Sequence, residues 1–332
     1  MKLKVLIWGT GNEYAMYIEE IGILIEEGKI EILALINDKD VKELDGYPVI
    51  SKDDIKMYQY DHIIIATGEE KERSIRRDME SVGIDQSKVS NIREFVAEYG
   101  DPDKYYRQNV NGQIKILQEL LDATDEQITD YDWMYGRICE YGIFRFVNDL
   151  RQLEDVHWTR YGILQIAEEF TKFCCYLSTL TINTAIELGV AKGRSSYLMC
   201  AILQRKNPGL EYNLVDIDDQ LDAYEEYLEV LPSMKKIMPS TSEDFKNNVY
   251  DFVFIDADHS YNGSMSDWLN LGQYANVLTA FHDVYAHEYD GYDGGIVRTW
   301  KEVLELTKGK QYRVFSQYPD RWMGIGCIEH QK

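Results

Sequence analysis

Acidic and histidine side chains follow two neighbouring apolar runs in the C-terminal half of the sequence. Asp256, Asp258 and His259 come directly after one run, and His282 and Asp283 come directly after the next. Carboxylates and an imidazole that converge from neighbouring strands can hold a divalent cation, and a remaining imidazole can take a proton from a hydroxyl group. The sequence therefore predicts a catalytic or metal-binding centre at these positions.

A second motif predicts a loop around a small nucleoside ligand. Glu187 ends an apolar run, Gly189 and Gly193 follow four residues apart, and Ser195 and Ser196 stand where a helix begins. Glycine adopts positive φ and lets backbone N–H groups approach a ligand, while serine hydroxyls can bond the free amides of the helix. Glu187 is placed to accept from a ligand amine. Purely structural turns of this kind are also common in α/β proteins.

Two more acidic residues stand where a nucleoside would need partners. Asp216 ends the next apolar run, where a carboxylate can accept hydrogen bonds from both ribose hydroxyls. Asp218 and Asp219 are placed to cap the following helix. Asp244 and Phe245 follow a third run and would lie near a bound adenine, although a capping turn explains the same two residues equally well.

These residues must be positioned by strands whose carboxyl ends lie along one edge of a sheet. Seven apolar runs predict strands, and helical stretches separate the first five. The last two runs have only residues 317–323 between them, which permits a hairpin and an antiparallel edge. The predicted strands are 184–188, 212–216, 236–239, 251–256, 277–282, 312–316 and 324–328.

The beginning of the chain also alternates strand and helix patterns. Runs 4–8, 30–36 and 62–66 predict the parallel sheet of a small Rossmann-like domain. Its turn 9–14 has glycine at positions 9 and 11, but Tyr14 stands where a dinucleotide-binding fingerprint has glycine. Both a structural or dimerising role and recognition of a nucleotide or sugar nucleotide remain open for this domain.

The middle of the chain lacks strand runs and shows helical periodicity with many aromatic residues. We therefore expect an α/β protein in three parts. Residues 1–97 form the small Rossmann-like domain, 98–181 form a helical connector that caps the substrate, and 182–332 form a seven-stranded Rossmann-like domain.

Composition limits the classes of partner. The 332 residues include 35 basic and 58 acidic side chains, and the net charge of −23 repels nucleic acid and anionic membranes. No run approaches the roughly 18 apolar residues of a membrane helix. Five cysteines without a Cys-x-x-Cys spacing indicate neither a zinc site nor a disulfide framework. We expect a soluble protein of the reducing cytoplasm.

The C-terminal part resembles the class I S-adenosylmethionine-dependent methyltransferases. A later segment is similar to the small-molecule O-methyltransferase branch that is grouped with cephalosporin-hydroxylase-like proteins. The residues that carry the resemblance are Glu187-x-Gly189-x-x-x-Gly193-x-Ser195, Asp216, Phe254-Ile-Asp-Ala-Asp-His-Ser-Tyr261, Phe281-His-Asp-Val284 and Gly294-Gly-Ile-Val-Arg-Thr-Trp300. The N-terminal domain resembles those attached to bacterial sugar-modifying enzymes.

The resemblance implies a role for each matching residue. The glycine loop with Ser195, Glu187, Asp216, Asp244 and Asp256 would bind S-adenosylmethionine. In metal-dependent relatives, acids at the positions of Asp256, His282 and Asp283 hold magnesium, so Mg²⁺ or another divalent cation is implied here. The base of those relatives falls at His259, with Asp256 and Asp283 beside it. His282 replaces an acid, and a hard cation prefers oxygen ligands.

The favoured hypothesis is O-methylation of a small hydroxylated molecule, such as a sugar or glycosylated metabolite. One alternative is an oxidoreductase or epimerase that binds NAD(P) or a nucleotide sugar at the turn of Gly9 and Gly11. Another is a noncatalytic nucleotide-binding scaffold. We expect a small-molecule substrate and no nucleic-acid or membrane partner, and a homo-oligomer is left open.

Overall fold

The computed structural model describes residues 2–37, 41–81, 83–145, 156–319 and 322–330. The chain divides into two compact units. The N-terminal unit comprises residues 1–109 and 144–162, and the C-terminal unit comprises residues 110–143 and 163–332. Among the described residues, no helix is long and apolar enough to cross a membrane. The predicted α/β fold class is confirmed for both units.

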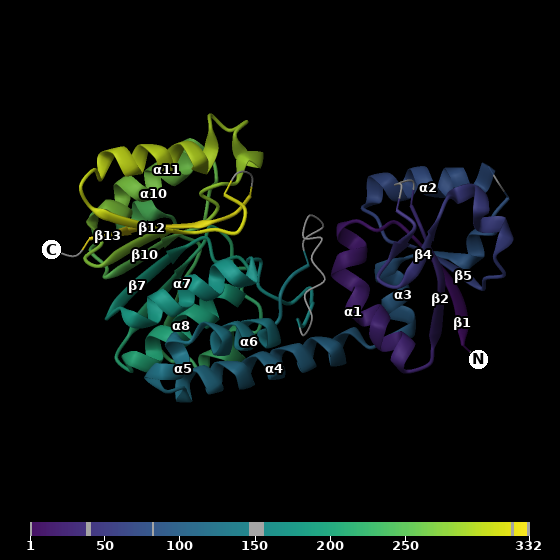
Figure 1. The fold of residues 1–332 in the computed structure, drawn as a ribbon, viewed down its shortest axis with the longest axis horizontal. Coiled ribbons are helices and arrows are strands. Elements are labelled where there is room, and N and C mark those ends of the chain that lie inside the picture. The colour runs from purple at the N-terminus through teal and green to yellow at the C-terminus, as the bar shows by residue number, and fades with distance from the viewer. Residues whose placement is uncertain (1, 38–40, 82, 146–155, 320–321, 331–332) are drawn as a thin grey trace. The chain divides into compact units, whose positions relative to one another are not determined.

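The C-terminal unit contains a seven-stranded sheet in the order β12-β13-β11-β10-β7-β8-β9 (Figure 1). Neighbouring strands are parallel except that β13 runs antiparallel to both β11 and β12. Each of the seven predicted runs overlaps a strand, although the run 236–239 shares only residues 236–237 with β9, and the last two form the predicted antiparallel pair. The strands are β7 Thr184–Leu188, β8 Glu211–Val215, β9 Met234–Ile237, β10 Phe252–Ile255, β11 Leu278–Phe281, β12 Gln311–Phe315 and β13 Ile325–Glu329.

Helices cover both faces of this sheet. On one face lie α7 (Ala167–Thr179) and α8 (Arg194–Lys206), and on the other lie α10 (Tyr261–Asn270) and α11 (Gly295–Leu306) (Figure 1). The strands β10 and β11 are buried along their whole length. Continuous apolar runs, rather than alternating ones, are what a parallel sheet covered on both faces requires.

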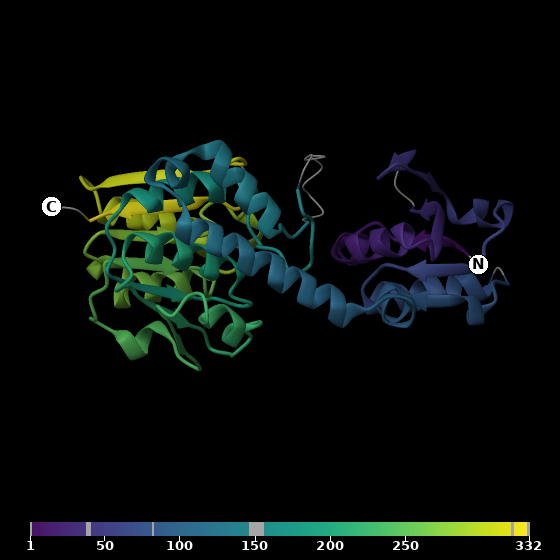
Figure 2. The same cartoon turned by 90° about the horizontal axis from the view of Figure 1, so that it is seen from below.

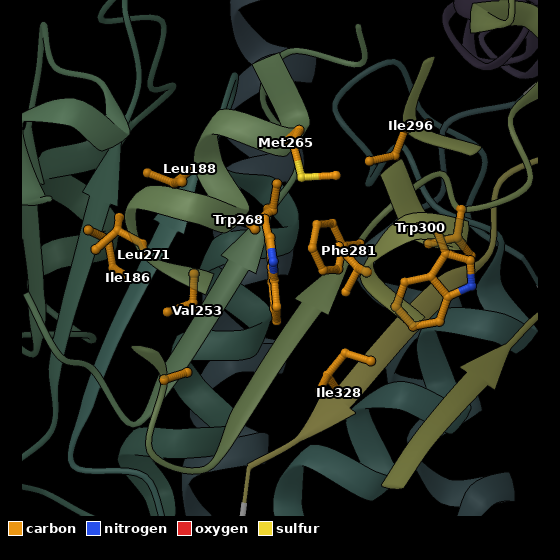
Figure 3. Close-up of a cluster of buried hydrophobic side chains, with 14 of the residues drawn as sticks. Ile186, Leu188, Val253, Met265, Trp268, Leu271, Phe281, Ile296, Trp300 and Ile328 are labelled. Carbon is orange, nitrogen blue, oxygen red and sulfur yellow. The ribbon is translucent and has the colours of Figure 1, made fainter. Parts of the chain in front are cut away.

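Aromatic side chains fill the core beneath α10 and α11. Figure 3 shows Trp268, Phe281 and Trp300 beside one another, with Met265 and Ile296 above them. The ring of Phe281 lies 5.9 Å from that of Trp268 and 5.8 Å from that of Trp300, as centroid distances. This packing fixes the carboxyl ends of β10 and β11, which carry the predicted catalytic residues.

Three further helices of the C-terminal unit come from the segment predicted as a connector. These helices are α5 (Asp125–Thr129), α6 (Tyr131–Tyr141) and the second half of α4 (Pro102–Asp122). In the view of Figure 2 they stand in front of the sheet together with α7. A short α9 (Tyr224–Leu228) precedes β9.

The N-terminal unit has a six-stranded sheet in the order β3-β4-β2-β1-β5-β6. Helices α1 and α3 pack on one face and α2 packs on the other. The three predicted strands correspond to β1, β2 and β5. The elements are β1 Leu3–Trp8, α1 Asn12–Glu26, β2 Ile30–Ile36, β3 Glu43–Leu44, β4 Tyr47–Ile50, β5 His62–Ile65, α2 Glu69–Ser81, β6 Val89–Asn91 and α3 Ile92–Tyr99.

Part of the expected connector belongs to the N-terminal unit. Arg160 lies 4.7 Å from the ring centroids of both Tyr17 and Tyr161 and is 2.9 Å from the buried carboxylate of Glu20. The segment predicted as 98–181 is therefore shared between the units. Residues 146–155 of that segment lie outside the described residues.

Candidate active site

The loop after β7 has the backbone geometry that its glycines predict. Gly189 and Gly193 have φ of +82° and +78°. A Cβ atom on Gly189 would lie 2.2 Å from the carbonyl oxygen of Asp256, and one on Gly193 would lie 2.7 Å from the ring of Tyr197. Because both positions combine positive φ with close contacts, larger residues would displace the loop.

Asp216 ties the end of β8 to this loop. Its Oδ2 atom accepts hydrogen bonds from the backbone N–H groups of Val190 and Ala191, each at 3.0 Å. The Oδ1 atom is 3.4 Å from the N–H of Asp218. The Oδ2 atom therefore holds the loop, whereas the Oδ1 atom makes a single long contact. The contact of Asp216 with a ribose stays a prediction.

The predicted serine caps at the start of α8 were wrong. Gly193 occupies the N-cap position, and no side chain caps the helix. Ser195 lies half-buried in the first turn, and Ser196 is completely buried. A capping side chain must stand before the free amides to reach them, whereas both serines are already inside the helix. The first amides of α8 are therefore not satisfied by side chains.

Arg194 anchors the same loop from within the protein. It is 4% exposed, and its guanidinium donates to Gln113 at 2.8 Å, to Asp222 at 2.9 Å and to the hydroxyl of Tyr227. The hydroxyl of Tyr141 donates to the carbonyl of Arg194 at 3.1 Å. A helix from the expected connector thus helps to position the glycine loop.

Glu187 lies behind the loop, on the face of the sheet that α8 covers. It is buried and accepts a hydrogen bond from the hydroxyl of Tyr212 at 2.8 Å. Burial raises the pKa of its carboxyl group to about 8, against the opposing effect of Tyr212. Because side chains alternate along a strand, Glu187 and Leu188 point to opposite faces of the sheet. Leu188, and not Glu187, lines the cavity at the carboxyl ends of the strands. The contact of Glu187 with a ligand amine stays a prediction.

A cavity of about 610 Å³ lies at the carboxyl ends of β7, β8, β9 and β10. This volume is within the roughly 300–1,000 Å³ typical of small-molecule sites. The cavity is lined by Leu188, Gly189, Ala191, Val215, Asp216, Ile217, Ser240, Thr241, Ser242, Glu243, Asp256, Ala257, Asp258, His259, Gly263, Ser266 and Asp267.

Asp244 does not line this cavity. Its Oδ2 atom accepts from the N–H of Thr241 at 2.9 Å and from the hydroxyl of Ser240 at 3.0 Å, which closes a capping box at the start of the short helix 242–245. The capping alternative therefore describes Asp244. Its neighbours Ser240–Glu243 take the place beside the cavity.

Four side chains form a closed ring of contacts after β10 and β11. Nε2 of His259 lies 3.3 Å from Oδ1 of Asp256 and 3.1 Å from Oδ2 of Asp283. Nδ1 of His282 lies 3.2 Å from Oδ1 of Asp256 and 3.4 Å from Oδ1 of Asp283. Asp283 adopts a φ of +62°, an uncommon conformation of the kind often found at functional sites. The predicted convergence of these residues is present.

The ring alternates carboxylates with imidazoles, and these groups shift one another's pKa. Burial lowers the pKa of His259, but hydrogen bonds to Asp256 and Asp283 outweigh it and raise the pKa to about 9. The two aspartates likewise raise the pKa of the buried His282. Burial raises the pKa of Asp283, but His282 and His259 reverse this effect and hold it well below its usual value. The contacts within the ring therefore favour the protonated forms of both imidazoles.

The segment that follows β11 contacts this ring directly. The ring of Tyr289 stacks on the imidazole of His259, with centroids 4.4 Å apart and planes inclined by 16°. Asp258 stays outside the ring of contacts, because its carboxylate accepts from the N–H of Ser260 at 2.8 Å. Asp258 therefore shapes the turn before α10 and also lines the cavity.

The family comparisons separate the two units. Residues 186–284 match a family model described as a methyltransferase domain. The C-terminal unit contains a methyltransferase domain. This match confirms the predicted resemblance to methyltransferases. Residues 1–90 match a second model, described as C2185-like, N-terminal. No curated protein matches the chain.

Solved structures similar to the chain cover about half of it. Cofactor-bound Rv0187 from MTB is 14% identical and covers 51% of this chain and 83% of its own, with a TM-score of 0.40. The O-methyltransferase from Bacillus cereus in complex with SAH is 14% identical and covers 50% and 82%, with a TM-score of 0.37. SAH-bound PaMTH1 from Podospora anserina is 12% identical and covers 50% and 79%, with a TM-score of 0.40.

The methyltransferase domain offers one group of side chains with metal-ligand spacing among the described residues. Donor atoms of Asp256, His259 and Asp283 all lie within 4.8 Å of one another. The sequence predicted Asp256, His282 and Asp283 instead. The structure gathers His259 into this group because the turn after β10 points its imidazole back between the two carboxylates.

The N-terminal unit has a glycine turn and a cavity of its own. The cavity, of about 750 Å³, is bordered by Gly9, Gly11 and the residues that follow β5. Tyr14 is buried in the core and donates to Asp45 at 2.9 Å. The large side chain at position 14 therefore packs α1 against the core. Only the cavity of the C-terminal unit, of these two cavities, adjoins an acid and histidine centre.

Proposed function

We propose that the protein transfers a methyl group from S-adenosylmethionine to a hydroxyl group of a small molecule, with sugars or glycosylated metabolites as the acceptor class. The observation that carries the proposal is the position of one cavity. It runs from the glycine loop and Asp216 to Asp256 and His259. A cofactor site and a centre able to accept a proton are thus continuous.

The cavity has features that fit S-adenosylmethionine. At Gly189 the backbone itself lines the cavity, because glycine has no side chain. The Oδ1 atom of Asp216 makes only one long contact and can accept hydrogen bonds from hydroxyl groups. The carboxylates in its lining complement a cationic ligand. When bound, S-adenosylmethionine supplies an electrophilic methyl group on a positively charged sulfur.

His259 is the proposed base. A hydroxyl acceptor must lose its proton as the methyl group is transferred, and a positioned base contributes roughly 10²–10⁴-fold to such a step. In its neutral form His259 can take that proton at Nε2. Asp256 and Asp283, at 3.3 and 3.1 Å, then stabilise the imidazolium that forms. The stacked ring of Tyr289 holds the imidazole in place.

The chemistry of the donor group suits a divalent cation with some affinity for nitrogen. Asp256, Asp283 and His282 would hold it, which leaves Nε2 of His259 for the proton. Imidazole favours Mn²⁺, Fe²⁺ or Zn²⁺ over Mg²⁺, which prefers oxygen ligands alone. A bound cation would supply electrostatic stabilisation for an ionised hydroxyl.

Transfer of a labelled methyl group tests the proposal. The purified protein is incubated with S-adenosylmethionine that carries a CD₃ group and with the small-molecule fraction of a bacterial extract, and labelled products are found by mass spectrometry. We expect the label on an oxygen atom. His259→Ala should bind S-adenosylhomocysteine with unchanged affinity and lose about 10²–10⁴-fold in turnover.

Two outcomes of this assay would overturn the proposal. One is the label on nitrogen or carbon, and the other is wild-type turnover in His259→Ala.

For the cation, treatment with EDTA should lower turnover, and Mn²⁺ should restore it better than Mg²⁺. Full activity in EDTA would remove the cation from the proposal.

The alternative of an NAD(P)- or nucleotide-sugar-dependent enzyme would use the cavity beside Gly9 and Gly11. The size of that cavity is the observation in its favour. The bulk of Tyr14 and the acid and histidine ring in the other unit favour the methyltransferase instead.

A further inference from the structure

Glu169 is a buried carboxylate of the C-terminal unit that lies outside every predicted motif. It is the third residue of α7, is 1% exposed and precedes the segment 186–284 that matches the family model. Among the described residues, no lysine or arginine forms an ion pair with it. A carboxylate without a cationic partner is costly to bury, so the groups that it bonds indicate what it does.

The partners of Glu169 are backbone N–H groups at the two ends of the segment that joins β12 to β13. Its Oε1 atom accepts from the N–H of Gln317, and its Oε2 atom accepts from the N–H of Gly324 at 3.1 Å. Burial raises the pKa of Glu169 to about 6, against the opposing effect of these N–H groups. Two acceptor oxygens are needed at once, which a carboxylate offers and an amide does not.

The bond to Gly324 continues to the turn that follows β11. The peptide group between Met323 and Gly324 donates its N–H to Glu169, and its C=O accepts from the N–H of Tyr285 at 2.8 Å. A bond to a charged acceptor holds such a peptide group more firmly than a bond to a neutral one. One peptide group therefore connects the carboxylate of α7 with the turn that carries Asp283.

This turn contains a β-bulge. Phe281 lies opposite Gly326 in the antiparallel ladder of β11 and β13, so Asp283 would be expected opposite Gly324. Instead the N–H of Val284 bonds the C=O of Gly324 at 3.2 Å, which leaves one extra residue on the β11 side. Asp283 lies in this irregular step and has a φ of +62°. A bulge bends its strand and re-aims a side chain, often next to an active site.

The bulge determines where the carboxylate of Asp283 points. Its Oδ2 atom reaches Nε2 of His259 at 3.1 Å. On the opposite strand Gly324 has a φ of +90°, and a Cβ atom there would lie 2.9 Å from the ring of Tyr285. The bulge is therefore closely packed against Gly324, and a shift of Gly324 would be passed on to Asp283.

We propose that Glu169 is a positioning residue, which fixes the bulge after β11 and thereby aims the carboxylate of Asp283 at His259. This inference rests on the proposed function, because it takes His259 and Asp283 as the centre that accepts the proton. Glu169 does not line the cavity of the cofactor, so its role is in the chemical step and not in cofactor binding.

Turnover per cofactor site tests the inference. Transfer of the CD₃ group is measured for Glu169→Gln and divided by the number of S-adenosylhomocysteine sites that calorimetry finds. We expect turnover per site to fall about tenfold, because one of the two N–H groups loses its acceptor. The KM for S-adenosylmethionine should stay within about twofold of the wild type, because the cavity is unchanged.

NMR spectra of the metal-free protein give a readout that needs no acceptor. The imidazole signals of His259 should move in Glu169→Gln, because the carboxylate of Asp283 shifts beside them. Leu177→Ala is the matched control, since Leu177 is buried about two turns further along α7. It should lower the melting temperature and leave both the signals and the turnover per site unchanged.

Gly324→Ala displaces the same peptide group from its other side. It should reproduce the loss of turnover per site and the shift of the His259 signals, and it carries the test where Glu169→Gln does not fold. Wild-type turnover per site or unmoved signals in the folded variant, or an equal loss in Leu177→Ala, would overturn the inference. Absence of methyl transfer by the wild type would instead overturn the proposed function, and the NMR comparison would still decide what Glu169 positions.

Discussion

At the scale of single residues, the site depends on His259 and the two carboxylates that it bridges. Its contacts with Asp256 and Asp283 favour the imidazolium form, whereas a base must be neutral to accept a proton. The same carboxylates that would stabilise the product of the proposed proton transfer therefore also reduce the neutral fraction of His259. This balance makes the protonation of His259 the property to measure.

The pKa of His259 can be measured by NMR titration of the metal-free protein. We expect the imidazole to titrate near pH 9, and at a clearly lower pH in Asp283→Asn, because one of the two stabilising charges is gone. Asp258→Asn is the control, since Asp258 bonds Ser260 and not His259. An unchanged pKa in Asp283→Asn would contradict the electrostatic account.

The sign of the pH effect follows from the same pKa. Because folding raises the pKa of His259, its contribution to stability is present below pH 6.5 and is lost as pH rises toward 9. The neutral fraction of the base increases over the same interval. Stability and the supply of active base therefore change in opposite directions with pH.

At the scale of elements, the glycine loop and α8 are held by a buried arginine. Arg194 joins the beginning of α8 to Gln113 of α4, to Asp222 and to Tyr227 of α9. A buried charge is stable only while its partners remain in place. The loop that shapes the cavity is therefore fixed in part by a helix outside the matched family segment.

Arg194→Lys should destabilise the methyltransferase domain by about 2–4 kcal/mol, because a lysine cannot bond three partners with the geometry of a guanidinium. Arg205→Lys, at the other end of α8, is the control. Its acidic partner Asp125 is 95% exposed, so we expect less than about 1 kcal/mol from that pair. Urea unfolding measures both, and equal losses would contradict the anchoring role of Arg194.

The central strands of both sheets were predictable because they are short apolar runs followed by polar residues. The convergence of Asp256, His259 and Asp283 followed from the same rule, since strand ends share one edge of a sheet. Two other features depend on pairing and orientation that the sequence does not reveal. They are the burial of Glu187 behind the loop and the place of Asp267 on α10. For Asp244 the sequence allowed both a ligand contact and a cap, and the structure shows the cap.

At the scale of the whole molecule, two units each carry a glycine turn and a cavity. The turn at Gly9 precedes a helix whose residue Tyr14 is part of the core, whereas the loop at Gly189 borders a cavity that also reaches the acid and histidine ring. The central claim is that the second of these holds S-adenosylmethionine.

Hydrogen exchange of the intact protein with and without S-adenosylhomocysteine tests this claim most directly. We predict slower exchange in peptides that cover 188–196, 215–219 and 240–245, and unchanged exchange in 8–14 and 66–71. Protection of 8–14, or no protection anywhere at saturating ligand, would contradict it.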